Sequence, residues 1–257
     1  MTFIYDPDQA LREWSRIPID DLDYFSADEL LILRPEQLYQ LVRMAMSIRW
    51  DRNQWRNKDG ALVQFMFGDD QNRWKGKTVM DFGCGLGLDS VLFAANGANV
   101  ILADMHPKGL MLAQQALIQG TGGIIPSRIC ITSPVPPFFV TGGFDLFWSM
   151  GVLHHTPFCG EILKRACQLL NPGGEIRVCL YSDKRWKQMM DCDPPEDTPN
   201  HPRFQEFVKK CDAVGQYADW YEGGKVQKLV EGFAELTDSR YLCDDQFVGV
   251  VLKPKGK

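Results

Sequence analysis

The stretch Val79–Gly87 has the sequence VMDFGCGLG, an apolar run interrupted by Asp81 and followed by three glycines at alternate positions. Glycine allows the chain to turn tightly and to bring backbone amides close to a ligand without an intervening side chain. The loop therefore predicts a nucleotide-like ligand. A dinucleotide fingerprint starting at Gly83 would require another glycine where this chain has Leu88, and the Lys-Ser/Thr ending of a phosphate-binding P-loop is absent.

From Lys77 onward, short apolar runs alternate with amphipathic segments, a pattern typical of a parallel sheet wound with helices. The sequence predicts an α/β fold with a Rossmann-like, doubly wound, mostly parallel seven-stranded sheet and an antiparallel C-terminal hairpin. The expected strands are Thr78–Phe82, Asn99–Ala103, Arg128–Thr132, Phe144–Ser149 and Glu175–Tyr181, then the hairpin strands Phe233–Leu242 and Gln246–Leu252, and the expected helices are Asp89–Asn96, Pro107–Gln119 and Pro157–Leu170.

Residues 1–76 carry no strong strand pattern, and we expect a helical N-terminal extension or cap that precedes a domain over residues 77–257. Ser26 and Glu29 have the spacing of a capping box at a helix start. A longer helix is expected from Pro35 to about Trp50, because apolar residues recur at helical spacing and predict one buried face. That face consists of Leu38, Leu41, Val42, Ala45 and Ile48.

Within the larger domain, residues 182–230 are expected to form a lid-like insert. Its first part, Ser182–Pro202, is rich in proline and charge, which predicts an irregular loop. Before it, Asn171-Pro172-Gly173-Gly174 is expected to be a turn that ends one helix and leads into the fifth strand.

Composition narrows the class of protein. The chain has 257 residues, 45% of them hydrophobic, and a formal net charge of -5, which argues against a broad nucleic-acid-binding surface. Eight scattered cysteines show no Cys-x-x-Cys pair, so we expect reduced thiols and no metal site. Without a long apolar run or a signal-peptide pattern, a cytoplasmic location is expected.

Asp104 follows the next expected strand, about 20 residues after the loop. An acid at this place in a wound sheet accepts hydrogen bonds from both hydroxyls of a ribose. The alternative is that Asp104 only caps the helix that starts at Pro107. The order of loop and acid favours the ribose role.

Four motifs in order over residues 77–181 resemble those of class I S-adenosylmethionine-dependent methyltransferases, of the small-molecule type. They are Val79–Gly87, Ala103-Asp104-Met105, the run Phe144–His155 at the fourth strand, and Leu170-Asn171-Pro172-Gly173-Gly174-Glu175. The resemblance implies that the chain is an enzyme whose cofactor is S-adenosyl-L-methionine, and that the acceptor is a small molecule used in biosynthesis, methylated on oxygen, nitrogen or carbon.

The resemblance also implies roles for individual residues. Asp104 would hold the ribose, and Met105 and Met150 would flank the adenine. Asp89 either caps the next helix or reaches the methionine ammonium. Many members have an acid after the third strand for the adenine amino group, where this chain has Thr132-Ser133-Pro134. The full set of expected cofactor-binding residues is Asp81, Gly83, Cys84, Gly85, Gly87, Asp89, Asp104, Met105, Ser149 and Met150.

His154 and His155 follow the fourth strand, where a base that removes a proton from the acceptor would lie. A histidine titrates near neutral pH, so either one is a candidate catalytic base, and the alternative is that they shape the cofactor pocket. Aromatic side chains are a weaker sign of an acceptor wall. Those considered are Tyr181, Trp186, Trp220 and Tyr221, with Trp50 and Trp55 nearer the N-terminus.

Other functions remain open alternatives. The segment Ser149-Met150-Gly151-Val152 lacks both the Asn/Asp-Pro-Pro-aromatic run and the Pro-Cys nucleophile of DNA methyltransferases, which makes nucleic acid a minority reading. A methyltransferase acting on RNA or protein, or a non-catalytic partner subunit that binds S-adenosylmethionine, is not separated from the main prediction. A dehydrogenase is a distant third. The sequence does not identify the acceptor.

Overall fold

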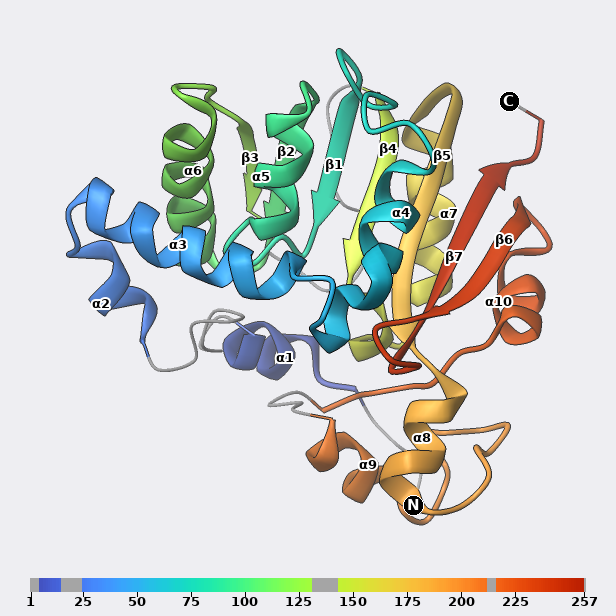
Figure 1. Ribbon diagram of the computed structural model, residues 1–257. Helices are drawn as coiled ribbons and strands as arrows, with labels where there is room; N and C mark the ends of the chain where they lie inside the picture. The colour runs from blue at the N-terminus through green and yellow to red at the C-terminus, as the bar shows by residue number, and fades with distance from the viewer. Residues whose placement is uncertain (1–4, 15–24, 131–142, 212–215, 257) are drawn as a thin grey trace.

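The computed structural model describes residues 5–14, 25–130, 143–211 and 216–256, and its centre is one mixed sheet (Figure 1). The strand order is β3-β2-β1-β4-β5-β7-β6 in a seven-stranded sheet. Neighbours from β3 to β5 pair in parallel, whereas β7 pairs antiparallel with both β5 and β6. The strands are β1 Thr78–Phe82, β2 Asn99–Asp104, β3 Ser127–Cys130, β4 Phe144–Met150, β5 Leu170–Tyr181, β6 Ala234–Leu242 and β7 Phe247–Pro254.

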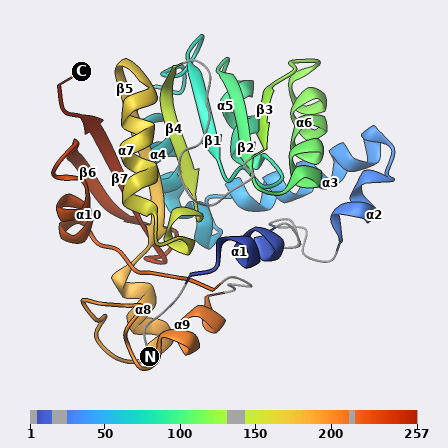
Figure 2. The ribbon, with the colours of Figure 1, turned by 180° about the vertical axis from the view of Figure 1, so that it is seen from behind.

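Helices cover both faces of the sheet (Figures 1 and 2). One face carries α3 Pro35–Trp50, α4 Ala61–Phe67, α5 Leu88–Ala95 and α6 Pro107–Thr121, and the other carries α7 Cys159–Leu169 and α10 Gly223–Val230. The α/β class with a mixed, helix-covered sheet is therefore confirmed. The remaining elements are α1 Pro7–Trp14, α2 Ala27–Leu31, η1 Trp55–Gly60, η2 Leu153–His155, α8 Asp183–Met190 and α9 Phe204–Lys210.

The two faces are separated by the two-residue period of the strands. Val79 and Leu146 belong to the core under α3–α6, while their neighbours Met80 and Phe147 belong to the core under α7 and α10. Asp81 lies on the same side as Val79 and therefore points toward α5. The carboxyl ends of β1, β2 and β4 lie at the lower edge of the sheet in both views, on the side of α1, α8 and α9.

The N-terminal helices follow the predicted pattern with one informative difference. Ser26 and Glu29 form the expected capping box, and α3 spans the expected range. On α3, however, Ile48 is half-exposed, and the residue that continues the buried stripe of Leu38, Val42 and Ala45 is Arg49, only 5% exposed. The expectation that Ile48 faces the core was wrong. At 3.6 residues per turn, the position that continues the buried face after Ala45 is that of Arg49.

Two further expectations are corrected in the second half of the chain. The helix α8 occupies Asp183–Met190 in the stretch expected to be irregular, and it starts because the Ser182 hydroxyl accepts a hydrogen bond from the Arg185 N–H. The expected turn at residues 171–174 lies inside β5. The register against β4 shifts between Phe144 and Leu146, so the turn residues form an irregularity in a strand that continues.

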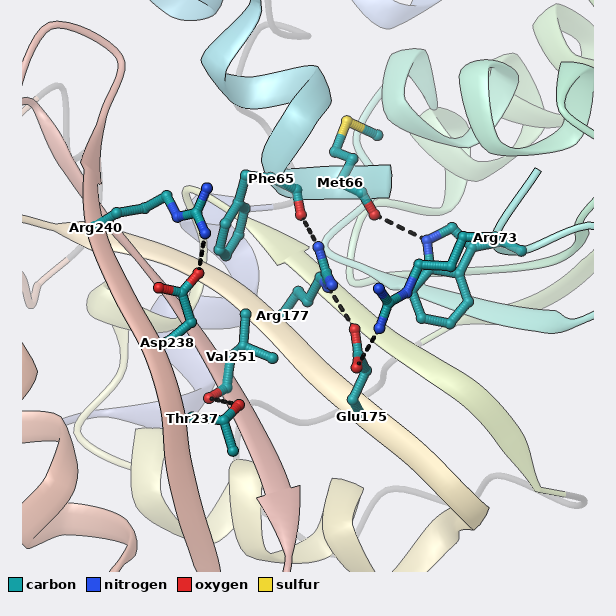
Figure 3. A network of polar contacts seen from close by, with 10 residues as sticks. Phe65, Met66, Arg73, Glu175, Arg177, Thr237, Asp238, Arg240 and Val251 are labelled. Atoms are coloured by element: carbon teal, nitrogen blue, oxygen red, sulfur yellow. Dashed lines mark hydrogen bonds and ion pairs between the residues drawn. The ribbon is translucent and has the colours of Figure 1, made fainter. Parts of the chain in front are cut away.

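A buried charged network joins the extension to the sheet (Figure 3). The carboxylate of Glu175 on β5 accepts hydrogen bonds from Arg73, at 2.8 Å, and from Arg177. The Arg177 guanidinium also donates to the Phe65 carbonyl at the end of α4. The residues on both sides of position 76 therefore pack into one core, since α3 and α4 share a hydrophobic cluster with β1 and β4.

Among the described helices, none combines the length and the apolar character needed to cross a membrane.

Candidate active site

The loop between β1 and α5 has a backbone that requires glycine. Gly83, Gly85 and Gly87 have φ values of 76°, 52° and 75°, in the left-handed region that disfavours a side chain. A Cβ on Gly83 would lie 2.3 Å from the Val152 side chain, whereas a Cβ on Gly85 would meet no atom of the described residues within 4 Å. Gly83 thus allows the segment after β4 to approach the loop, and Gly85 leaves a free space beside its backbone.

Asp104, at the end of β2, is bonded to this loop. One carboxylate oxygen accepts the Gly85 N–H at 2.8 Å and the other accepts the His106 N–H at 2.9 Å. Burial raises the pKa of Asp104 above its ordinary value. The alternative role as the cap of α6 was wrong, because His106 is the cap residue and its Nδ1 accepts the Gly109 N–H. The ribose role stays a prediction.

Asp81 lies under the loop and is almost completely buried. Its carboxyl group accepts a hydrogen bond of 2.6 Å from the Ser90 hydroxyl on α5. Burial, with a smaller contribution from the negative charge of Asp89, raises the pKa of Asp81 to about 8. A carboxyl group with this pKa is mainly protonated at neutral pH, so it is an uncharged hydrogen-bonding group that a nearby cation would convert to a carboxylate.

Asp89 is held by a residue that sequence reasoning missed. Its two carboxylate oxygens accept from Arg49 Nε at 2.9 Å and from the Trp148 indole N–H at 2.8 Å. Gly87 is the cap of α5, so the capping alternative for Asp89 was wrong. Arg49 comes from α3, in the extension, and the signal that could have identified it is its place in the stripe of Leu38, Val42 and Ala45.

The other expected cofactor residues lie around the same strand ends. Cys84 is half-buried, and burial raises the pKa of its thiol well above the ordinary value. The Ser149 hydroxyl is buried and donates to the Phe82 carbonyl at 2.8 Å, which links β4 to β1. Met105 and Met150 are half-buried and pack on opposite faces of the sheet. Thr132-Ser133-Pro134, the substitute for an adenine-binding acid, lies outside the described residues.

The candidate bases His154 and His155 occupy η2, directly after β4, and both are buried. His154 Nδ1 accepts the Tyr181 N–H at 3.1 Å, and its ring stacks on Tyr181 with centroids 3.5 Å apart. His155 Nδ1 lies 3.2 Å from the Tyr217 carbonyl oxygen. Burial lowers the pKa of His154 well below its ordinary value and that of His155 to about 4. Both rings are therefore neutral at pH 7.

The four aromatic residues considered for an acceptor wall are all buried and serve packing. Tyr181 donates its hydroxyl to the Cys211 carbonyl, and Trp220 donates its indole N–H to the Pro195 carbonyl. Trp186 and Tyr221 belong to the two hydrophobic clusters. They fix the insert on the sheet, as expected of large side chains in a core.

No group of three or more His, Cys, Asp or Glu side chains is arranged to hold a metal ion within residues 5–14, 25–130, 143–211 and 216–256. The groups that the described residues bring to this site are the glycine backbone, the carboxyl groups and the imidazoles.

Comparison with known proteins identifies the architecture. The model of a methyltransferase domain matches residues 74–230, more than half of the chain. A ubiquinone biosynthesis O-methyltransferase from Pseudomonas paraeruginosa is 32% identical over 108 residues, which are 42% of this chain and 46% of the relative. The chain thus spans about half the length of the curated relatives it matches.

Two solved structures have the same fold at low sequence identity. An S-adenosylmethionine-dependent methyltransferase from Clostridium acetobutylicum superposes with a TM-score of 0.57 at 13% identity, covering 83% of this chain and 97% of that one. Magnesium protoporphyrin IX methyltransferase from Synechocystis, with bound S-adenosylhomocysteine, gives a TM-score of 0.51 at 16% identity, covering 83% and 80%. Together with the domain match over residues 74–230, the loop and strand ends described above show that this chain belongs to the methyltransferase domain family.

Proposed function

We propose that this chain is an S-adenosylmethionine-dependent methyltransferase that transfers a methyl group to a small-molecule acceptor. The observation that carries the proposal is the hydrogen bond from the Gly85 N–H to the Asp104 carboxylate, because it joins the glycine loop to the acid of the neighbouring strand. The strand order changes direction between β1 and β4, and ligands of wound sheets bind beside the carboxyl ends at such a point.

The residues present fit this cofactor. The space beside Gly85 allows a ligand to approach the backbone, and Asp104 lies where it can accept from ribose hydroxyls. We assign the methionine end to Asp81, Asp89 and the backbone of Gly83, Cys84 and Gly87. The adenine is assigned to Met105 and Met150, with Ser149 supporting their strand ends through its bond to Phe82.

The cofactor, when bound, supplies a sulfonium methyl group that an acceptor atom displaces in line. The protein has to align the acceptor, exclude water and hold or remove a proton. The buried Asp81 carboxyl, whose pKa is raised to about 8, can ionise opposite the methionine ammonium, because a nearby positive charge favours the carboxylate. His154 and His155 stand at the end of β4, where a proton from the acceptor would be received.

We further propose that residues 77–257 form the catalytic domain, that residues 1–76 cap it, and that the insert over residues 182–230 borders the acceptor. The printed name of the Pseudomonas relative favours a biosynthetic acceptor methylated on oxygen over nitrogen or carbon. The position of the insert supports its role, since its helices α8 and α9 lie at the edge of the sheet where the parallel strands end. The cytoplasmic location stays a prediction.

The test is calorimetric titration of the chain with S-adenosylmethionine and S-adenosylhomocysteine, with a nicotinamide dinucleotide as the competing ligand. We expect micromolar binding of the first two, and Asp104→Asn should weaken it roughly tenfold or more, since hydrogen bonds to charged groups contribute about 1.5–3 kcal/mol. The matched control is Asp238→Asn on β6, which removes a carboxylate at the far edge of the sheet.

Turnover is measured separately as S-adenosylhomocysteine released with phenol, amine and active-methylene acceptors. Release with a phenol or another small acceptor supports the proposal. Tight binding without release on any small acceptor, protein or RNA would instead indicate a cofactor-binding partner subunit. Binding of the dinucleotide in place of S-adenosylmethionine would reject the proposal altogether.

A further inference from the structure

A short segment of the insert, residues 217–221, runs directly against both histidines. The Asp219 N–H donates to the His154 carbonyl at 2.9 Å, and the Tyr217 carbonyl oxygen lies 3.2 Å from His155 Nδ1. The Tyr221 N–H donates to the Tyr181 carbonyl at 2.7 Å, at the end of β5. The segment therefore contacts two elements, η2 and the end of β5, which meet at the histidine pair.

These contacts define where each ring carries its hydrogen. A carbonyl oxygen only accepts hydrogen bonds, so His155 carries its hydrogen on Nδ1 and a lone pair on Nε2. His154 is the opposite case, because its Nδ1 accepts the Tyr181 N–H and the hydrogen of the neutral ring is then on Nε2. Two adjacent imidazoles, with centroids 4.3 Å apart, are thus opposite tautomers.

The His154 Nε2–H has a further property. It is buried and has no hydrogen-bond partner among the described residues. A buried donor without a partner costs free energy, and such a group in a native protein calls for a functional reason. The His154 Nε2–H is complementary to an oxygen atom of a ligand, which accepts hydrogen bonds.

The segment is held in place by the carboxylate of Asp219, which is 6% exposed. Lys225 Nζ, from α10, lies 2.9 Å from each of its oxygens and 2.9 Å from the Trp220 carbonyl oxygen. The Thr198 hydroxyl and the Trp220 N–H also donate to this carboxylate. One buried carboxylate therefore joins three separate parts of the insert, the loop at Thr198, the segment 217–221 and α10.

We propose that Asp219 is a positioning residue that, through its ion pair with Lys225, holds residues 217–221 so that His154 and His155 adopt opposite tautomers. Under the proposed function, His154 then donates its Nε2–H to the acceptor, while the Tyr217 carbonyl fixes the orientation of the adjacent His155 ring. The inference about tautomers stands on the contacts alone, and only the link to turnover rests on the proposed function.

The primary experiment is long-range ¹H–¹⁵N NMR of the histidine rings in the full chain, which reports the tautomer without needing an acceptor. We expect Nδ1–H at His155 and Nε2–H at His154 in the wild type. Lys225→Met leaves Asp219 buried without its cation and should mix the tautomers at His155. Lys225→Arg, which keeps the charge, should preserve them. Nε2–H at His155 of the wild type would overturn the proposal.

Kinetics supply the second measurement once an acceptor is known. Lys225→Met and Asp219→Asn should lower kcat roughly tenfold or more with the KM of both substrates little changed, because small misplacements of a catalytic group cost one to two orders of magnitude. Lys225→Arg should recover most of this loss. Glu206→Gln, which breaks an exposed ion pair on α9 of the same insert, is the control and should change neither readout.

Thermal unfolding accompanies every variant. If Lys225→Met does not fold, Thr198→Val replaces it, because this variant removes one hydroxyl from the Asp219 carboxylate and leaves the charges paired. Unchanged tautomers and unchanged kcat in Asp219→Asn and in a folded Lys225 or Thr198 variant would refute the positioning role. Correct tautomers in a protein that turns over no acceptor would leave the inference intact and reject the proposed function.

Discussion

The glycine-loop half of the site and the histidine half both contain buried ionisable groups, but the pKa shifts have opposite directions and the groups have different partners. Around the loop, burial raises the pKa of Asp81 and Asp104, and a cation from another element, Arg49, balances Asp89. Around η2, burial lowers the pKa of both histidines, and backbone groups bind their rings. Burial therefore favours the uncharged forms of Asp81, Asp104 and the two histidines, and a charged ligand nearby would favour their ionisation.

The difference teaches which half depends on local sequence. The loop is shaped by three glycines within five residues, and its partner Asp104 follows after one helix and one strand. The histidine half depends on contacts made by residues 217–221, more than 60 positions away in the chain. Substitutions in the loop half should therefore change cofactor binding and stability, whereas substitutions around residues 217–221 should change the orientation of the histidine rings.

The largest effect on cofactor binding is expected at Gly83. Gly83→Ala places a Cβ 2.3 Å from the Val152 side chain at a φ of 76°, so both overpacking and backbone strain oppose the fold of the loop. We expect cofactor affinity to fall roughly a hundredfold, about 2.7 kcal/mol. Gly122→Ala is the matched control, because its φ is 73° but its Cβ would meet no atom within 4 Å. Equal losses of affinity in calorimetry would contradict the role of the Val152 contact.

The largest effect on the free energy of unfolding is expected at the buried ion pair of the loop half, Arg49 with Asp89. Arg49→Met leaves Asp89 buried without its cation and should lower the free energy of unfolding by about 3–5 kcal/mol. Adding Asp89→Asn should recover much of the loss, since no uncompensated charge then remains. Lys58→Met breaks the exposed pair with Asp244 and should cost at most about 1 kcal/mol. Denaturant unfolding measures all three, and an Arg49→Met variant as stable as Lys58→Met would reject the argument.

A smaller effect concerns Asp81 and pH. Between about pH 4 and 8 the folded protein binds more protons at Asp81 than the unfolded chain, because the folded pKa is raised to about 8. This contribution to stability is complete below pH 4 and is lost as the pH rises through 8. Relative to Asp81→Asn, the free energy of unfolding of the wild type should therefore fall by up to about 1.4 kcal/mol per pH unit across this window. A parallel pH dependence of the two proteins in urea unfolding would contradict the raised pKa.

The smallest effect has the opposite sign and belongs to the histidine half. The pKa of His155 is lowered to about 4, so between pH 4 and about 6.5 the folded protein binds fewer protons there than the unfolded chain. The free energy of unfolding should rise with pH across this shorter window, by up to about 1.4 kcal/mol per pH unit. His155→Asn should show a shallower rise. A steeper rise in His155→Asn would disprove the assignment.

The interior of the fold was largely predictable, because repeated short apolar runs carry the periods of strands and helices directly. The errors at α8 and at residues 171–174 have a common cause. The capping Ser182 also donates its hydroxyl to the distant Asp245 carbonyl, and the irregular register of β5 is set by its pairing with β4, so proline or glycine content alone does not predict them. Asp89 is the same case, since its buried partners Arg49 and Trp148 lie 40 and 59 residues away.

By itself, the sequence determined the individual strands and helices, the glycine loop and the position of Asp104 after the next strand. These features depend on backbone conformations and spacings that neighbouring residues dictate. Tertiary structure alone decided that Arg49 enters the loop half, that His106 caps α6, and that residues 217–221 orient the histidine pair. Burial is the physical reason. The charge state and hydrogen-bond partners of a side chain depend on which distant elements exclude water from it, and a linear pattern does not contain that information.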